Sequence, residues 1–164
     1  MVAKGSKINI RRKSIIGLLR NHSAILDELK RRKVVRTKNN PIGGYAEWLV
    51  SKKFKLKLEP NSNVGYDATD RRGIKYEIKG RRVTPDNPST QLSVIRGLKL
   101  KHFEYLIGVI FDENYNVRYA AKIPHSVVVE LSTYRKSVNG HIMHLQPTIL
   151  KNKRVKDITK NLTS

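Results

Sequence analysis

The chain has no cysteine, few acidic residues and no long apolar run. The lack of cysteine excludes disulfides and thiolate zinc sites, and it fits a reducing compartment. No apolar stretch approaches the ~20 residues that span a bilayer. The basic start, Met1–Lys13, is followed by no apolar signal-peptide region. We therefore expect no signal peptide, no membrane partner and a cytoplasmic location, on the nucleoid if the source is bacterial or archaeal.

Several well-known motifs are also missing from the sequence. It contains no Walker loop, no G-x-S-x-G and no dinucleotide fingerprint, and its histidines lack metal-ligand spacing. We therefore expect no small-molecule cofactor. The hydrophobic fraction is 38%, which is enough for one modest core and indicates a single domain in 164 residues.

Positive charge dominates what is present. Lysine and arginine total 34 against 13 acidic residues, which gives a formal net charge of +21. Such a surplus predicts a polyanionic partner, with nucleic acid first. Charge supplies affinity without chemistry, so a structural binder such as a ribosomal or nucleoid protein fits this feature equally well.

Residues 1–40 form a basic N-terminal part of the same domain. Met1–Ile10 reads as a flexible arm, and apolar residues at helical spacing predict a helix over about 13–33, broken at Asn21–Ser23 with Ser23 as a cap. The apolar stripe from Ile15 to Leu29 could pack on the core or on a second copy, so we expect a homodimer. The candidate DNA-contacting residues of this part are Arg31, Arg32, Arg36 and Lys38.

Residues 41–150 carry the pattern of an α/β (α+β) core. Asn40 and Pro41 predict the start of a helix. A hairpin follows at about 65–80, and Ser89 could cap a helix running to about Leu100. The later elements are a buried strand at 102–111, a returning strand at 117–123, a short helix after Pro124 and a strand at 140–147. Residues 151–164 read as a basic tail. We expect a central mixed β-sheet flanked by helices.

The stretch "GYDATDRRGIKYEIKGRR", residues 65–82, carries the chemistry. If Arg71–Gly73 is a three-residue loop with Gly73 left-handed, Asp70 pairs with Ile74. Counting back then puts Asp67 directly opposite Glu77, with Cβ atoms ~4.5–5.5 Å apart. Two carboxylates at that distance repel unless a cation lies between them, and Mg²⁺ with oxygen ligands suits such a site. Lys79 shares the face of Glu77 and could orient a water and stabilise charge on a phosphate.

This Asp followed by Glu-x-Lys on a hairpin resembles the PD-(D/E)xK nuclease superfamily, which has the restriction-endonuclease-like fold. The resemblance spans about residues 41–123, and "NNP" before the helix with "GYDA…IKGRR" is similar to a group of its small members. It implies that Asp67 and Glu77 bind metal and that Lys79 assists the attacking water. Many members add a glutamate from the preceding helix, which here is Glu47. Tyr66 stands where the family name has proline.

The expected function is therefore a metal-dependent, restriction-like endonuclease that hydrolyses DNA phosphodiester bonds with Mg²⁺, for which Mn²⁺ could substitute. Two alternatives stay open: a non-catalytic DNA-binding module on the same fold, and a structure-selective junction resolvase. A second Glu-x-Lys, Glu28–Lys30, lies on a predicted helix, where residues two apart do not share a face. Further candidate nucleic-acid contacts are Lys75, Arg81, Arg82 and Gln91, with Ser89 beside them.

Overall fold

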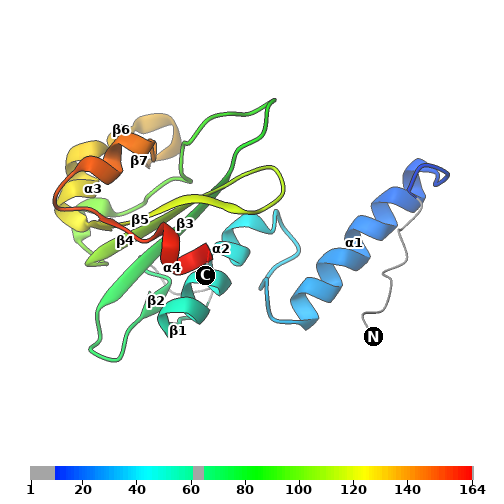
Figure 1. Cartoon of the computed structure of the whole chain (residues 1–164), viewed down its shortest axis with the longest axis horizontal. Coiled ribbons are helices and arrows are strands. Elements are labelled where there is room, and N and C mark those ends of the chain that lie inside the picture. Colours follow the sequence, from blue (N-terminus) through cyan, green and yellow to red (C-terminus); the bar gives the residue numbers. More distant parts are fainter. Residues whose placement is uncertain (1–9, 61–64, 164) are drawn as a thin grey trace. The chain divides into compact units, whose positions relative to one another are not determined.

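The computed structural model describes residues 10–60 and 65–163. The expected arm, apart from Ile10, and the turn at Asn61–Asn63 lie outside the described residues. The chain divides into two compact units, Met1–Pro41 and Ile42–Ser164. Helix α1 (Ile15–Arg31) belongs to the first unit, and the six-stranded sheet belongs to the second (Figure 1).

Helix α1 is continuous, so the predicted break at Asn21–Ser23 is wrong. Its cap is Ser14, whose hydroxyl accepts the Gly17 N–H at 3.1 Å, and not Ser23. Asparagine, histidine and serine inside a helix each cost only about 0.5 kcal/mol relative to alanine, which is too little to end it without proline or glycine.

The second unit is built on a six-stranded mixed sheet in the order β1-β2-β3-β4-β5-β8. The strands β3 and β4 are parallel, and the other neighbours are antiparallel. The strands of this sheet are β1 (Lys57–Leu58), β2 (Ala68–Thr69), β3 (Lys75–Arg82), β4 (Tyr105–Phe111), β5 (Val117–Pro124) and β8 (Lys156–Asp157). The other elements are α2 (Ile42–Phe54), α3 (His125–Leu131), α4 (Thr159–Thr163), the hairpin strands β6 (Thr133–Arg135) and β7 (Gly140–Ile142), and 3-10 turns at Leu98–Leu100, Lys136–Val138 and Pro147–Lys151.

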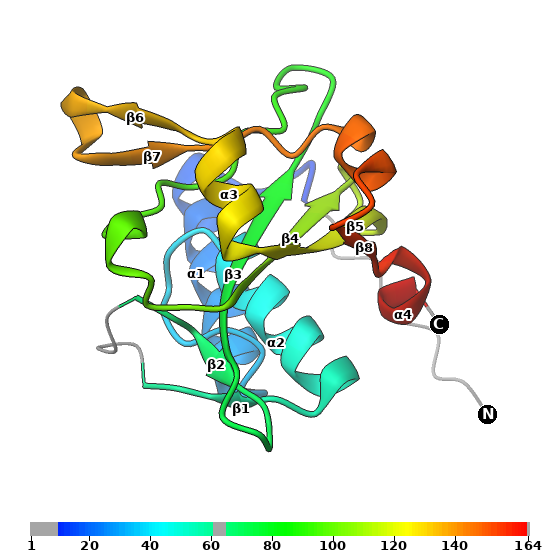
Figure 2. The same cartoon turned by 90° about the vertical axis from the view of Figure 1, so that its left-hand side faces the viewer.

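Helices cover both faces of this sheet, as expected for a mixed α/β fold (Figure 2). On one face, which we call the α3 side, Val127 and Val128 pack with Leu106 and Ile110 of β4. On the other face, the α2 side, residues of α2 and α4 pack on alternate positions of the same strands. The predicted strands at 102–111 and 117–123 and the short helix after Pro124 are confirmed.

The hairpin turn also forms as predicted. Gly73 has φ +79°, its N–H donates to the Asp70 carbonyl, and the Asp70 N–H donates to the Ile74 carbonyl at 3.1 Å. The ladder continues to Ala68 opposite Tyr76 and ends there. The predicted direct Asp67–Glu77 pair is therefore not part of the ladder, because the Asp67 N–H instead donates to the Tyr76 carbonyl at 2.8 Å.

The predicted helix from Ser89 to Leu100 is wrong apart from the 3-10 turn at its end. Leu92, Ile95 and Leu98 have helical spacing, but they are buried on an irregular, largely extended segment. The backbone of this segment finds partners far along the chain: the Leu92 N–H donates to the Met143 carbonyl, and the Ile95 N–H donates to the His141 carbonyl, both at 2.9 Å. These long-range bonds replace the local helical ones.

The end of the chain is more structured than the expected basic tail. It supplies β8 at the edge of the sheet and the short helix α4. Ile158 is 1% exposed and Leu162 is 4% exposed, and both belong to the core of the α2 side. Residues 151–164 thus help to close the core.

Candidate active site

The candidate site lies where β2 leaves β3. The ladder between them ends at Ala68, so the N–H of Ile78 on β3 has lost its strand partner. The carboxylate of Asp67 replaces that partner and accepts the Ile78 N–H at 2.7 Å. An unpaired buried N–H would be costly, so this bond fixes Asp67 beside the centre of the Glu77–Lys79 segment.

Glu77 and Lys79 project together from β3 toward the α3 side of the sheet. Their β4 neighbours in the register are Leu106 and Gly108, and strand alternation keeps both on one face. The side chains are only 12% and 16% exposed, and Lys79 Nζ lies 2.5 Å from Glu77 Oε1. The site is therefore a largely buried ion pair next to a second, partly buried carboxylate, Asp67.

Burial first and the nearby charge of Glu77 second raise the pKa of Asp67 to about 7, against the opposing effects of Lys79 and the Ile78 N–H. Burial by itself lowers the pKa of Lys79, but the negative charges of Glu77 and Asp67 outweigh it and the net shift is upward. Lys79 therefore stays protonated at neutral pH. It suits the roles of hydrogen-bond donor and fixed positive charge better than that of a base.

Glu47, on α2, lies near enough for its charge to act on this cluster. Its charge contributes to the raised pKa values of Asp67 and Lys79. Helix α2 can approach β3 closely because residue 80 is glycine. A Cβ there would lie 2.7 Å from Ala46 Cβ, which is too close for real Cβ contacts. The structure thus brings the four residues predicted for catalysis into one electrostatic cluster.

The fit of a divalent metal rests on this donor set. Within residues 10–60 and 65–163, no group of three or more acidic or histidine side chains has the geometry of a ready-made metal site. The oxygen donors of Asp67, Glu77 and Glu47 nevertheless match the preference of Mg²⁺. The pKa of Asp67 is raised first by burial and second by repulsion from Glu77, and a bound cation would relieve that repulsion.

The two arginines that follow the site lie on different faces. Arg81 shares the face of Lys79, and its guanidinium donates to the Ser89 carbonyl at 2.9 Å and to Asn87 Oδ1 at 2.8 Å. Arg82 points to the α2 side, where it donates to the Glu113 carbonyl and lies 4.7 Å from the Tyr115 ring centroid. Only Arg81 accompanies the candidate site, and it also holds the loop after β3.

Two further predicted contacts, Lys75 and Gln91, lie in the second unit. Lys75 is on the face of Glu77, with Nζ 5.0 Å from the Tyr66 ring centroid. Gln91 is exposed and forms an isolated bridge with His144, and its N–H donates to the Ser89 hydroxyl at 3.3 Å. Ser89 therefore caps a local turn and not a helix.

The remaining predicted contacts belong to the first unit. Arg31 and Arg32 both pair with Glu28 at 2.7 Å, which holds the pKa of that carboxyl down at about 2. Lys38 pairs with Asp27 at 2.5 Å. Arg36 belongs to the same basic segment. All of these ion pairs are exposed, so each basic group can exchange its partner for a phosphate at little cost.

Sequence reasoning missed a second polar cluster on the α2 side of the sheet. Lys122 on β5 shares that face with Ala120 and Ile107, and it lines a pocket with Arg72 and Lys156. The available signal was a lysine at an inward position of the apolar strand "YAAKI".

Comparisons with known proteins give no further information on identity. No protein-family model matches the chain, and no curated protein matches it. Across the described part of the chain, none of the helices is both long enough and apolar enough to cross a membrane.

Proposed function

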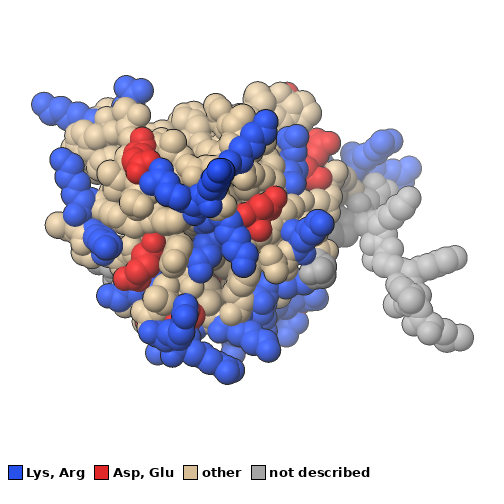
Figure 3. All heavy atoms as spheres, turned by 60° about the vertical axis from the view of Figure 1, so that its left-hand side comes forward, with Lys and Arg blue, Asp and Glu red and all other residues tan. Residues whose placement is uncertain are grey.

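We propose that this protein is a metal-dependent endonuclease that hydrolyses DNA phosphodiester bonds, with a restriction-endonuclease-like core. The observation that carries the proposal is the partly buried cluster of Asp67, Glu77 and Lys79 at the point where β2 leaves β3. A net charge of +21 supports a polyanionic substrate, and Figure 3 shows many lysine and arginine side chains on the face in view, with smaller acidic patches among them.

In this proposal Asp67, Glu77 and Glu47 would hold Mg²⁺ or Mn²⁺. The ion would supply Lewis-acid stabilisation of the phosphate when bound. Lys79, kept protonated by its acidic neighbours, would donate to the attacking water or to a phosphate oxygen. Arg81, on the same face as Lys79, would contact the DNA phosphate backbone beside the site.

A duplex cut needs two such sites, so the proposal includes a homodimer. Within its own unit, α1 leaves Ile15, Leu18 and Leu19 uncovered, with exposed fractions from 41% to 81%. These residues could form an interface between two copies.

The second candidate function is a DNA-binding module without cleavage. Two observations favour it: Glu77 is already paired with Lys79 at 2.5 Å, and the described residues contain no ready-made three-ligand metal group. This alternative predicts tight, salt-dependent DNA binding that Glu77→Ala leaves unchanged.

The experiment that separates the two functions is a nicking assay on supercoiled, linear and branched DNA, with and without Mg²⁺ or Mn²⁺. We expect metal-dependent nicking, lowered about 100-fold or more by Lys79→Ala and by Glu77→Ala. The matched controls are Lys153→Ala and Glu113→Ala, which change exposed residues of the same charge and should cut normally. Binding without cutting by the wild type on every substrate would reject the nuclease, and preferential cutting of branched DNA would indicate a junction resolvase.

A further inference from the structure

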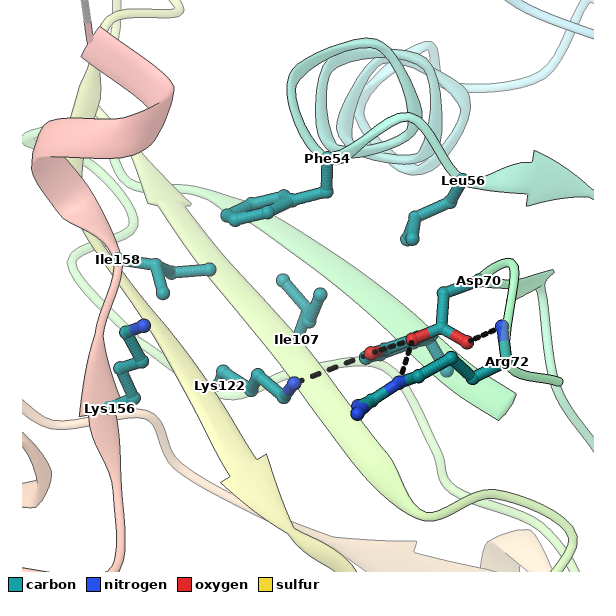
Figure 4. Close-up of a pocket in the computed structure, with 9 residues that line it drawn as sticks. Phe54, Leu56, Asp70, Arg72, Ile107, Lys122, Lys156 and Ile158 are labelled. Carbon is teal, nitrogen blue, oxygen red and sulfur yellow. Dashed lines mark hydrogen bonds and ion pairs between the residues drawn. The ribbon is translucent and has the colours of Figure 1, made fainter. Parts of the chain in front are cut away.

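A second polar hollow lies on the opposite face of the sheet from the candidate active site. Its floor is the α2 side of β3, β4 and β5, where Ile107 lies beside Lys122 in the register. Glu77 and Lys79 point the other way by strand alternation. The hollow has a volume of about 280 Å³, and Figure 4 shows Phe54 and Leu56 above it with Ile158 and Lys156 at one side.

Lys122 is held in this hollow by aromatic groups. Its Nζ lies 4.0 Å from the Tyr105 ring centroid and 5.0 Å from the Tyr76 ring centroid, and it donates to the Tyr76 hydroxyl at 3.3 Å. Among the described residues, no carboxylate lies within ion-pair distance of this ammonium. Burial lowers its pKa, Asp70 opposes the shift, and Lys156 and Arg72 add to it. Lys122 is thus fixed in place with its charge unneutralised.

The charges around Lys122 favour an anion. Arg72 and Lys156 line the same hollow, and Asp70 is its acidic residue. The Asp70 carboxylate is already occupied, since it accepts the backbone N–H groups of Arg72 and Ile74 and the Tyr76 hydroxyl. Arg72 Nε is 3.9 Å from it. Three cations against one satisfied carboxylate leave an excess of two positive charges, which matches the dianion of a phosphate monoester at neutral pH.

The remaining wall of the hollow is apolar. Phe54 and Leu56 lie above the cations, and Ile107 and Ile158 lie beside Lys122 and Lys156. Inorganic phosphate would leave this surface unused, whereas a flat apolar ring attached to the phosphate would cover it. The volume is at the small end of the range for ligand pockets, roughly 300 Å³, which suits a ligand no larger than one nucleotide.

We propose that this hollow is a binding site for a nucleoside 5′-monophosphate group, with the phosphate between Lys122, Lys156 and Arg72 and the base against Phe54 and Leu56. The group could come from a free nucleotide or from the 5′-phosphorylated end of a strand, because both present the same chemistry. The site is separate from Asp67, Glu77 and Lys79, and the inference holds whether or not the protein cuts DNA.

The test follows the lysine side-chain NMR signals of the full chain while dAMP or inorganic phosphate is added at constant ionic strength. The Lys122 signal is assigned by its loss in Lys122→Gln. We expect dAMP to shift this signal to saturation and to bind about tenfold more tightly than inorganic phosphate, because only dAMP covers the apolar wall. The exposed Lys156→Gln variant should weaken dAMP binding about tenfold or more, as expected for the loss of a charged partner.

The matched control is Lys99→Gln, which removes an exposed lysine that does not line the hollow and should leave dAMP affinity unchanged. Equal losses in Lys99→Gln and Lys156→Gln, or a Lys122 signal that does not move, would overturn the proposal, because the binding would then be general charge attraction.

Short single strands with a 5′-phosphate or a 5′-hydroxyl identify the source of the group. A shift of the Lys122 signal by the phosphorylated strand alone supports a strand end, and a shift by dAMP alone supports a free nucleotide. An equal shift by both strands means that a phosphodiester binds, which contradicts the monoester site.

Discussion

Two lysines on opposite faces of one sheet have opposite surroundings. Lys79, on the α3 side, lies 2.5 Å from a carboxylate, and acidic neighbours raise its pKa. Lys122, on the α2 side, contacts two tyrosine rings, and burial lowers its pKa. Burial alone therefore does not determine the role of a lysine. In our proposals, Lys79 belongs to a cluster that would hold a metal ion, whereas Lys122 would attract a phosphate.

The largest expected difference between the two lysines is in stability. Lys79→Met would leave buried carboxylates without their counter-charge and should lower the free energy of unfolding by about 3–5 kcal/mol at pH 7. Lys122→Met should change it by no more than about 1 kcal/mol, since it loses a cation–π contact and a buried charge together. Urea unfolding of both variants measures the difference. Equal losses would show that the two surroundings are energetically alike.

The pH dependence of stability isolates Asp67. Its pKa is about 7 in the folded protein and 3.8 when unperturbed, so between these values the native state holds a proton that the unfolded state has released. This group therefore makes stability fall as pH rises through that window, by at most about 1.4 kcal/mol per pH unit, with no further loss above pH 7. Asp67→Asn keeps an acceptor for the Ile78 N–H and should remove the slope. Parallel unfolding curves for wild type and variant would contradict the raised pKa.

The smallest expected effect separates the two arginines after the site. Arg81 lies on the face of Lys79, so Arg81→Gln should weaken DNA binding several-fold and reduce the salt slope by about 1. Arg82 is held on Tyr115 at the other face, so Arg82→Gln should leave the slope unchanged. Fluorescence anisotropy titrations at several salt concentrations distinguish the variants. A larger slope change in Arg82→Gln than in Arg81→Gln would indicate that DNA contacts the face of Arg82 and not the face of Lys79.

Sequence rules based on neighbouring residues correctly predicted the elements that neighbouring residues determine. Gly73 and the alternation around it determine the hairpin turn, and the apolar run before Phe111 predicts β4. The same rules failed where long-range hydrogen bonds determine the backbone conformation. The segment around Leu92 and Ile95 pairs with residues 141–143 and is not helical. Residues 151–164 were predicted to be a tail because the segment is mostly polar and basic. Two of its side chains, Ile158 and Leu162, reach the α2-side core, which is too few to form a recognisable pattern.

The candidate site was predictable in composition but not in detail. The Glu-x-Lys alternation and the glycine turn brought Asp67, Glu77 and Lys79 together from sequence alone. The bond from the Ile78 N–H to the Asp67 carboxylate was not predictable, because it depends on where β2 turns away from β3. The Lys122 hollow was missed because its cations come from three separate parts of the chain, at Arg72, Lys122 and Lys156.

The most direct test of the central claim is a Mn²⁺ titration of ¹⁵N-labelled protein. Mn²⁺ is paramagnetic, so it broadens the amide signals close to its binding site. If Asp67, Glu77 and Glu47 hold the metal, the Ile78 amide should broaden at low Mn²⁺ in the wild type and stay sharp in Glu77→Gln. Broadening that is the same in both proteins, or that misses Ile78, would contradict a metal site at this cluster and with it the proposed nuclease.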